Sequence, residues 1–143
     1  MNNNLLKELT DHIKEHEGFS QLVYDCPAGY STVAYGRNLD TKGISKEEGE
    51  YLLKNDIAAA KQEIAKMIKD FDSLPDKAKL VLVDLTFNMG LNGVMKFQNM
   101  LDAIDARDWQ KASDELLDSR YAAQTKRRAR LNASYLISCS DEH

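Results

Sequence analysis

Several residue types that mark other classes of protein are scarce in this chain. It has only 2 cysteines among 143 residues. Cys26 and Cys139 do not form the disulfide framework of a small secreted domain and are typical of a protein made in a reducing compartment. The 2 prolines and 7 glycines are too few to supply a turn at every hairpin of an all-β sandwich.

Long apolar segments and a surplus of positive charge are absent as well. No run approaches the ~20 apolar residues that span a bilayer. The polar start MNNNLLKELTDHIKEHEG lacks the apolar core of a signal peptide. We therefore expect a protein made in the cytoplasm without a membrane anchor. The net charge of −4 argues against nucleic acid as the main partner, because proteins with that partner are more often basic.

The remaining composition is that of an ordinary globular protein. The chain is 43% hydrophobic and 29% charged, which argues against disorder and fibrous repeats. A chain of this length buries about 68–70% of its unfolded surface. One domain can therefore fold without a metal ion or a disulfide.

The first third of the chain predicts a helix followed by a small sheet. Leu5, Leu9 and Ile13 recur every four residues, and Gly18 is a natural terminator of the helix they define. Residues 19–43 contain short β-prone runs separated by Pro-Gly and Asp-to-Gly turns, which predict a twisted antiparallel sheet.

Helical patterns fill the rest of the chain. The Ser45-Lys46-Glu47-Glu48 capping box opens a long helix to about Lys69. A second helix begins near Pro75, and its stretch LVLVDLTFNMG is apolar nearly all round, so we expect it to be buried and to end at Gly90. Shorter helices are expected near residues 95–105, 108–118 and 125–138.

These elements predict an α+β fold in a single domain, residues 1–143. A small lobe of helix and antiparallel sheet, about residues 15–55, would be joined by the long helix to a larger all-helical lobe. The larger lobe would comprise about residues 70–143 and the N-terminal helix. A cleft between the two lobes would be the natural ligand site.

Glu17 stands out by its place in the last turn of the first predicted helix. A carboxylate there faces the negative end of the helix dipole, which disfavours ionisation. Such a position suits a general acid that stays protonated near neutral pH. On position alone, an exposed helix-end glutamate such as Glu8 or Glu15 is the more common case.

Cys26 and Asp25 occupy the turn after the first predicted strand. Either could act as a base: the thiol if a nearby arginine lowers its pKa, or the carboxylate, which could also simply turn the chain. Thr32 opens the next strand, either as a strand former or as a hydroxyl that positions water. No metal site is expected, because there is no CxxC pattern and His12 and His16 share one helix face with no third ligand nearby.

Five cations and no acid occupy residues 120–131. Three of them lie in the first turn of a predicted helix that Thr125 would cap, where cations oppose the helix dipole at a cost of about 0.3–1 kcal/mol each. Such charge is either placed for use, to pair with Glu17 or to bind an anionic polymer, or is simply solvated. The cations are Arg120, Lys126, Arg127, Arg128 and Arg130.

The spacing of three candidate residues carries a family resemblance. Eight residues separate Glu17 from Cys26, and five separate Cys26 from Thr32. This spacing resembles the Glu–Asp/Cys–Thr catalytic pattern of phage-type lysozymes, the endolysin muramidases of glycoside hydrolase family 24. Further blocks in the same order also resemble that family, so the likeness covers almost the whole chain. These blocks are HEGF, VYDCPAGYSTVAYGRNLDTKG, FNMG, the segment 93–97 and SRYAAQTKRRAR.

The resemblance implies a role for each matching residue. Glu17 would protonate the glycosidic oxygen, Cys26 would activate or orient the attacking water, and Thr32 would hold that water. Arg128 would pair with the catalytic glutamate. The residues that would bind substrate are Asn38, Phe87, Asn88, Arg120, Gln124 and Arg128.

The resemblance also implies a reaction and a setting. A monomer without metal or cofactor would hydrolyse, with inversion, the β-1,4 bond between N-acetylmuramic acid and N-acetylglucosamine in peptidoglycan. Because the sequence shows no export signal, we expect it to reach the cell wall, and lyse the bacterium, only once a holin or its equivalent opens the membrane. One departure stands out: Arg37 replaces a family histidine, so the His–Asp salt bridge of the small lobe is not expected here.

Three other functions stay open. A lytic transglycosylase manages with one catalytic acid and gives a 1,6-anhydro product. A protein that kept the fold and lost catalysis would bind or regulate the wall. A nucleic-acid binder built on the basic run would lose affinity steeply with salt.

Overall fold

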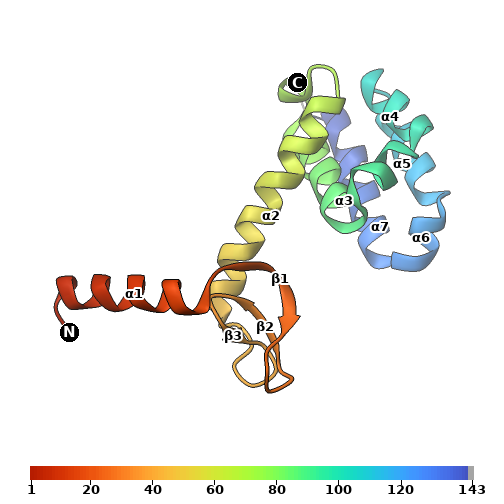
Figure 1. The fold of residues 1–143 in the computed structure, drawn as a ribbon. Helices are drawn as coiled ribbons and strands as arrows, with labels where there is room; N and C mark the ends of the chain where they lie inside the picture. Colours follow the sequence, from red (N-terminus) through yellow and green to blue (C-terminus); the bar gives the residue numbers. More distant parts are fainter. Residues whose placement is uncertain (142–143) are drawn as a thin grey trace. The chain divides into compact units, whose positions relative to one another are not determined.

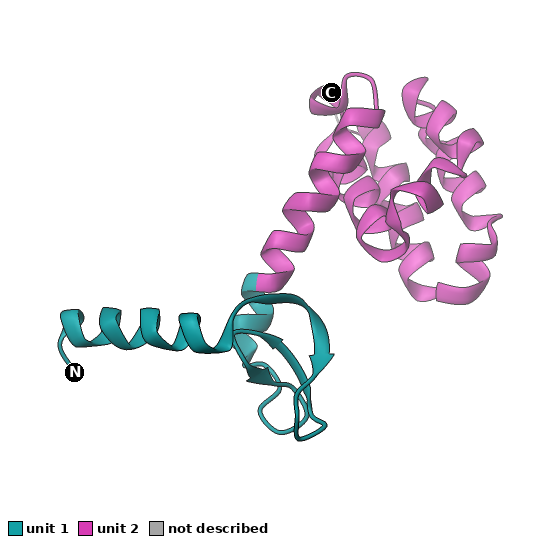
Figure 2. Cartoon of the chain, in the orientation of Figure 1, with its two compact units in different colours: residues 1–51 teal, residues 52–143 magenta. Residues whose placement is uncertain are grey.

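The computed structural model describes residues 1–141. Contacts between residues divide the chain into two compact units, residues 1–51 and residues 52 onward (Figure 2). Unit 1 combines a helix with a small sheet, and unit 2 is helical throughout its described part (Figure 1). The expected α+β class is confirmed.

The first helix, α1 (Asn3–Glu17), is delimited at both ends by its sequence. The side chain of Asn2 accepts a hydrogen bond from the N–H of Leu5 at 2.8 Å and caps the N-terminus. Gly18 ends the helix with φ of +69°, and its N–H donates to the carbonyl of Lys14. The helix expected from the leucine spacing is therefore confirmed.

The sheet of unit 1 has three antiparallel strands in the order β1 (Ser20–Asp25), β2 (Ser31–Ala34) and β3 (Arg37–Asn38). All three lie in the region 19–43 that the turn pattern assigned to a sheet. Short connections between successive strands give the meander topology expected of adjacent hairpins.

Helix α2 (Lys46–Met67) begins in unit 1 and continues into unit 2. The predicted capping box is present: the N–H of Glu48 donates to Ser45 Oγ at 3.1 Å, and the N–H of Ser45 donates to Glu48 Oε1 at 2.9 Å. The Glu48 carboxylate also accepts two hydrogen bonds from the Arg37 guanidinium, at 2.9 and 2.7 Å. This pair ties β3 to the start of α2.

Unit 2 packs the second part of α2 with further helices around one hydrophobic core. The buried side chains include Ile64 from α2 and Val81, Leu82 and Leu85 from α3, all fully buried. The remaining elements are η1 (Phe71–Ser73), α3 (Asp76–Met95), α4 (Gln98–Asp105), α5 (Trp109–Leu117), α6 (Arg120–Thr125), α7 (Arg127–Ser138) and η2 (Cys139–Asp141).

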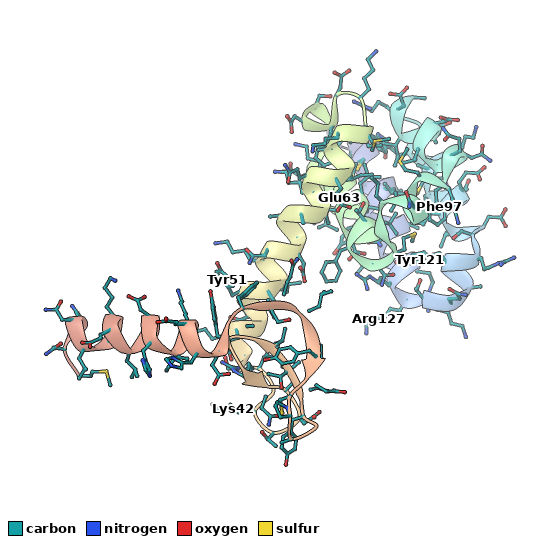
Figure 3. The ribbon with its side chains drawn as sticks, in the orientation of Figure 1. Lys42, Tyr51, Glu63, Phe97, Tyr121 and Arg127 are labelled. Carbon is teal, nitrogen blue, oxygen red and sulfur yellow. The ribbon has the colours of Figure 1, made fainter. Side chains whose placement is uncertain are left out.

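The structure differs from the sequence prediction at two places in unit 2. Gly90 ends the first helical segment of α3 as predicted, with φ of +81° and ψ of 161°, but a second helical segment that was not predicted follows it and runs to Met95. The short helix α6 was not predicted. Tyr121 packs it against the core, and the Tyr121 ring forms a T-shaped pair with the Phe97 ring at a centroid distance of 6.3 Å (both residues are labelled in Figure 3).

The expected cap of the last helix was wrong. The Thr125 hydroxyl donates back to the carbonyl of Tyr121 at 2.9 Å and so belongs to α6. Lys126 links α6 and α7 with φ of +43° and ψ of −85°, and its side chain makes no capping hydrogen bond. A lysine in this region of backbone space is strained.

Two expectations about domain organisation stay predictions. Contacts assign α1 to unit 1, whereas the sequence placed the N-terminal helix with the helical lobe. The expected cleft is likewise left as a prediction. Across residues 1–141, no helix combines the length and apolar character needed to cross a bilayer.

Candidate active site

The Glu17 carboxyl lies against the turn between β2 and β3. A β-carbon placed on Gly36 would come within 2.7 Å of Glu17 Oε2 and within 3.1 Å of its carboxyl carbon. Gly36 also has φ of +82°, which favours glycine. The turn therefore approaches the carboxyl as closely as it does because position 36 carries no side chain.

Cys26 opens the turn between β1 and β2. Its N–H donates to the carbonyl of Tyr30 at 2.9 Å, and the N–H of Gly29 donates to the carbonyl of Cys26 at 2.8 Å. The backbone N–H groups of Ala28, Gly29 and Tyr30 and the hydroxyl of Thr32 lie within hydrogen-bond reach of the sulfur. The side chain is partly exposed, so a small molecule can approach it.

The donors of this turn favour the thiolate form of Cys26. The N–H of Tyr30 contributes most to lowering the pKa of the thiol, burial opposes that effect, and Ala28, Thr32 and Gly29 add to the lowering. An arginine was the donor expected from the sequence, but in the structure backbone N–H groups and the Thr32 hydroxyl lower this pKa instead. A lowered pKa raises the thiolate fraction near neutral pH, as a base requires.

Thr32 and Asn38 are partners on adjacent strands, β2 and β3. Thr32 is only 3% exposed, and its hydroxyl donates to the carbonyl of Tyr30 at 2.8 Å. The side-chain oxygen of Asn38 accepts from the N–H groups of Asp40 and Thr41, at 3.0 and 3.1 Å. Thr32 is therefore brought next to Cys26, whereas the Asn38 oxygen is occupied in a turn.

Asp25, the alternative base, lies on the other face of the hairpin. Thr32 pairs with Tyr24, and paired residues of antiparallel strands share a face. Successive side chains alternate between faces. Cys26 therefore falls on the face of Tyr24 and Thr32, and the exposed Asp25 on the opposite one.

In unit 2, Arg128 is held by an aspartate from another helix. Its Nε donates to Asp84 Oδ2 at 3.0 Å, and its Nη2 donates to Asp84 Oδ1. Asn132 Nδ2 donates to the same Oδ2 at 2.9 Å. Burial alone would raise the pKa of Asp84, but the hydrogen bonds from Arg128 and Asn132 outweigh it and lower that pKa.

A pocket of about 420 Å³ in unit 2 brings Arg128 together with Phe87. Asp84 also lines it, and the rest of its wall is aliphatic: Leu53, Ile57, Leu80 and Val83. The other predicted binding residues of this unit, Asn88, Arg120 and Gln124, are exposed and do not line this pocket. The structure therefore joins two of the five substrate-binding candidates in unit 2.

Most of the basic run has no charged partner. Within residues 1–141, Arg128 is the only one of the five cations that forms an ion pair. Arg127, labelled in Figure 3, lies at the first turn of α7 and is exposed. The other three unpaired cations are Arg120, Lys126 and Arg130.

Comparison with protein families gives a match over most of the chain. A family model described as phage lysozyme matches residues 14–132, which include the Glu17, Cys26 and Thr32 positions and reach beyond Arg128. The chain belongs to the phage lysozyme family. As a phage lysozyme it is a glycoside hydrolase of the lysozyme type, as the sequence predicted.

Curated relatives of this phage lysozyme come from an amoeba and from a phage. In an alignment 154 positions long, it is 24% identical to probable T4-type lysozyme 1 of Dictyostelium discoideum. This alignment covers 87% of this chain and 91% of that one. Over 89 residues, 60% of this chain, it is 35% identical to the pre-baseplate central spike protein Gp5 of Enterobacteria phage T4, of which that stretch is 16%. Probable T4-type lysozyme 2 of Dictyostelium discoideum is 30% identical over 89 residues, 60% of this chain and 52% of that protein.

Two polar residues of the phage lysozyme site were missed by the sequence analysis. Asp84 interrupts the apolar stretch LVLVDLTFNMG, and a carboxylate in a buried helix needs a partner. A carboxylate in such a stretch indicates a cationic partner elsewhere in the chain. The sequence does not identify that partner, because Arg128 lies 44 residues from Asp84 and only the fold brings the two together. Asn132 is 3% exposed and carried no sequence signal.

Neither a metal centre nor the family's small-lobe salt bridge is seen among the described residues. Across residues 1–141, no three His, Cys, Asp or Glu side chains cluster as metal ligands. Arg37, which replaces the family histidine, pairs with Glu48 instead. The roles assigned to individual site residues remain predictions.

Proposed function

We propose that this lysozyme hydrolyses the β-1,4 bond between N-acetylmuramic acid and N-acetylglucosamine in peptidoglycan. Family membership and the two relatives named T4-type lysozymes support a muramidase. The observation that carries the proposal is the setting of Glu17. Its carboxyl lies at a helix end against a glycine turn, in the same unit as a hairpin that presents a thiol and a hydroxyl on one face.

In the proposed reaction, Glu17 donates its proton to the glycosidic oxygen as the bond from that oxygen to the anomeric carbon breaks. Cys26, as the thiolate, accepts a proton from the attacking water, whose oxygen forms the new bond to the anomeric carbon. Thr32 holds that water. A general acid and a general base acting on opposite faces of the sugar give inversion.

Substrate binding is assigned to residues carried over from the family. Phe87 would pack against the glycan, and Arg128 would pair with the catalytic glutamate. The remaining proposed contacts come from Asn38, Asn88, Arg120 and Gln124. We further propose that the protein acts as a monomer, is made in the bacterial cytoplasm, and reaches the wall after the membrane is opened.

Release of soluble fragments from purified peptidoglycan tests the proposal. Wild-type protein should release them, and Glu17→Gln should reduce the rate by roughly 10²–10⁴, the usual contribution of general acid–base catalysis. Glu15→Gln is the matched control, because Glu15 is an exposed glutamate on the same helix. Peptidoglycan binding without fragment release by wild-type protein would make this a wall-binding protein and contradict the proposal.

A further inference from the structure

Among residues 1–141, side chains hold the guanidinium of Arg128 on one edge. Its Nε and Nη2 atoms donate to the two oxygens of Asp84. An arginine side chain has five N–H donors in a fixed plane. This bidentate contact uses two of them and leaves the Nη1–Nη2 edge for another acceptor.

The carboxylate that holds Arg128 is itself fixed by a third residue. Asn132 donates to Asp84 Oδ2 at 2.9 Å and is 3% exposed, so its amide is locked in the packed interior of unit 2. Arg128 and Asn132 are one helical turn apart on α7, while Asp84 lies on α3. Two packed helices therefore determine where the guanidinium lies.

The Arg128–Asp84 pair lies in a partly buried, largely apolar pocket. The Arg128 and Asp84 side chains are 40% and 27% exposed, so the pair is neither a fully solvated surface bridge nor a buried one. Both line the pocket whose other walls are aliphatic or aromatic. Interactions of a charge are stronger beside apolar walls than in open water, so the direction of the free edge matters.

We infer that Asp84 and Asn132 are positioning residues for Arg128, fixing its Nε–Nη2 edge so that its Nη1–Nη2 edge can donate to a carboxylate or sugar oxygen of substrate bound at the pocket of unit 2. This inference rests on the proposed function, in which Arg128 serves catalysis. Lysine could not replace Arg128 here, because a single ammonium lacks two separate donor edges. Asp84 also offsets part of the positive charge that Arg128 brings to the site.

A kinetic double-mutant cycle tests whether Asp84 acts through Arg128. kcat/KM for fragment release is measured for wild type, Asp84→Asn, Arg128→Ala and the double variant, at a temperature where thermal unfolding shows each to be folded. Asp84→Asn should lower kcat/KM by roughly tenfold or more, since small misplacements of a positioned group cost that much. In the Arg128→Ala background the same change should cost less than about twofold.

The Arg37–Glu48 pair supplies the matched control. It is also a bidentate arginine–carboxylate contact, at 2.9 and 2.7 Å, and its residues do not line the pocket with Arg128. Glu48→Gln should show the same fractional effect with and without Arg128, because the two pairs share no partner. If Asp84→Asn does not fold, Asn132→Ser enters the same cycle in its place.

The outcomes separate this inference from the proposed function. A wild-type protein that releases no fragments contradicts the proposed function and removes the role assigned to Arg128. If the wild-type protein is active but Asp84→Asn lowers kcat/KM equally in both backgrounds, the positioning role is contradicted and the proposed function is not. We expect Asp84→Asn to lower kcat/KM in the wild-type background and to have little effect in the Arg128→Ala background. We also expect Arg128→Lys to lose activity.

Discussion

The thiol of Cys26 lies where a short turn directs backbone N–H groups at its sulfur. Donors of this kind stabilise an anion. The register of β1 and β2 puts the sulfur on the face of Thr32 and puts Asp25 on the other face. At the scale of single residues, these two facts support the proposal that Cys26 is the base.

Exchanging the two candidate bases separately tests that assignment. Cys26→Ser should lower the rate of fragment release by at least about 10², because a hydroxyl does not ionise near neutral pH. Asp25→Asn should change it by less than about threefold. The reverse pattern would make Asp25 the base.

The pH dependence gives a second test with a fixed sign. A thiolate base is lost as the pH falls through the pKa of the thiol, which here lies below the usual value. A carboxylate ionises near pH ~4. Cys26→Asp should therefore move the acid limb of the kcat/KM profile to lower pH, and an unmoved limb would contradict a base role for Cys26.

At the scale of elements, the Arg37–Glu48 pair joins the sheet to α2. The hydrogen bonds from Arg37, with further ones from Ser45, lower the pKa of Glu48 to about 2. A carboxyl whose pKa is lowered by folding stabilises the fold fully above its unfolded pKa. That contribution is lost as the pH falls toward the folded pKa.

Glu48→Gln should accordingly lower the melting temperature at pH 7 and make stability less sensitive to pH between about 4.5 and about 2. Thermal unfolding followed by circular dichroism over this range measures both effects. Asp11→Asn is the control, because the Lys7–Asp11 pair has 80% and 60% exposed side chains and should contribute little. Equal effects of the two substitutions would contradict the structural role of Glu48.

The link between α6 and α7 is strained at Lys126, which has φ of +43°. Lys126→Gly should therefore raise stability, by up to about 1 kcal/mol, since glycine adopts this region without a steric penalty. Lys126→Ala, which removes the same charge but keeps a β-carbon, should raise stability by less than Lys126→Gly does. Urea unfolding compares the two, and destabilisation by both would show that residue 126 is not strained.

The sequence predicted the elements whose signals are local and missed contacts that only the fold creates. The capping box at Ser45 and the glycine that ends α1 each act within a few residues, and both were predicted. Helix α6 is too short for its periodicity to show. Arg128 and Asp84 are 44 residues apart, so the sequence contains both residues but does not show that they are in contact.

The candidate site was predicted unevenly for the same reason. The Glu17, Cys26 and Thr32 spacing lies within one short segment, and the structure brings Thr32 to Cys26 as that spacing implied. Five of the six binding candidates come from α3, α6 and α7 of unit 2, and the pocket described above brings together Phe87 and Arg128 from this set. Predicting which side chains converge from separate helices requires the packing itself.

At the scale of the whole molecule, lysis by the proposed route depends on access of the protein to the cell wall. Production of the protein in the bacterial cytoplasm should leave cells intact, and a membrane-permeabilising agent should then cause rapid lysis. Culture turbidity with a membrane-potential dye follows both events, and Glu17→Gln should give permeabilised cells that do not lyse. Lysis while the membrane potential persists would contradict the proposed route.

In the proposed reaction, this phage lysozyme adds water across the glycosidic bond with Glu17 as the acid. Mass spectrometry of fragments released in ¹⁸O-labelled water tests this reaction most directly, with Glu17→Gln as control. We expect reducible muramic acid ends that carry one solvent oxygen and that are absent from the control. Unlabelled 1,6-anhydro ends would contradict it, because they would show a lytic transglycosylase in which Cys26 activates no water.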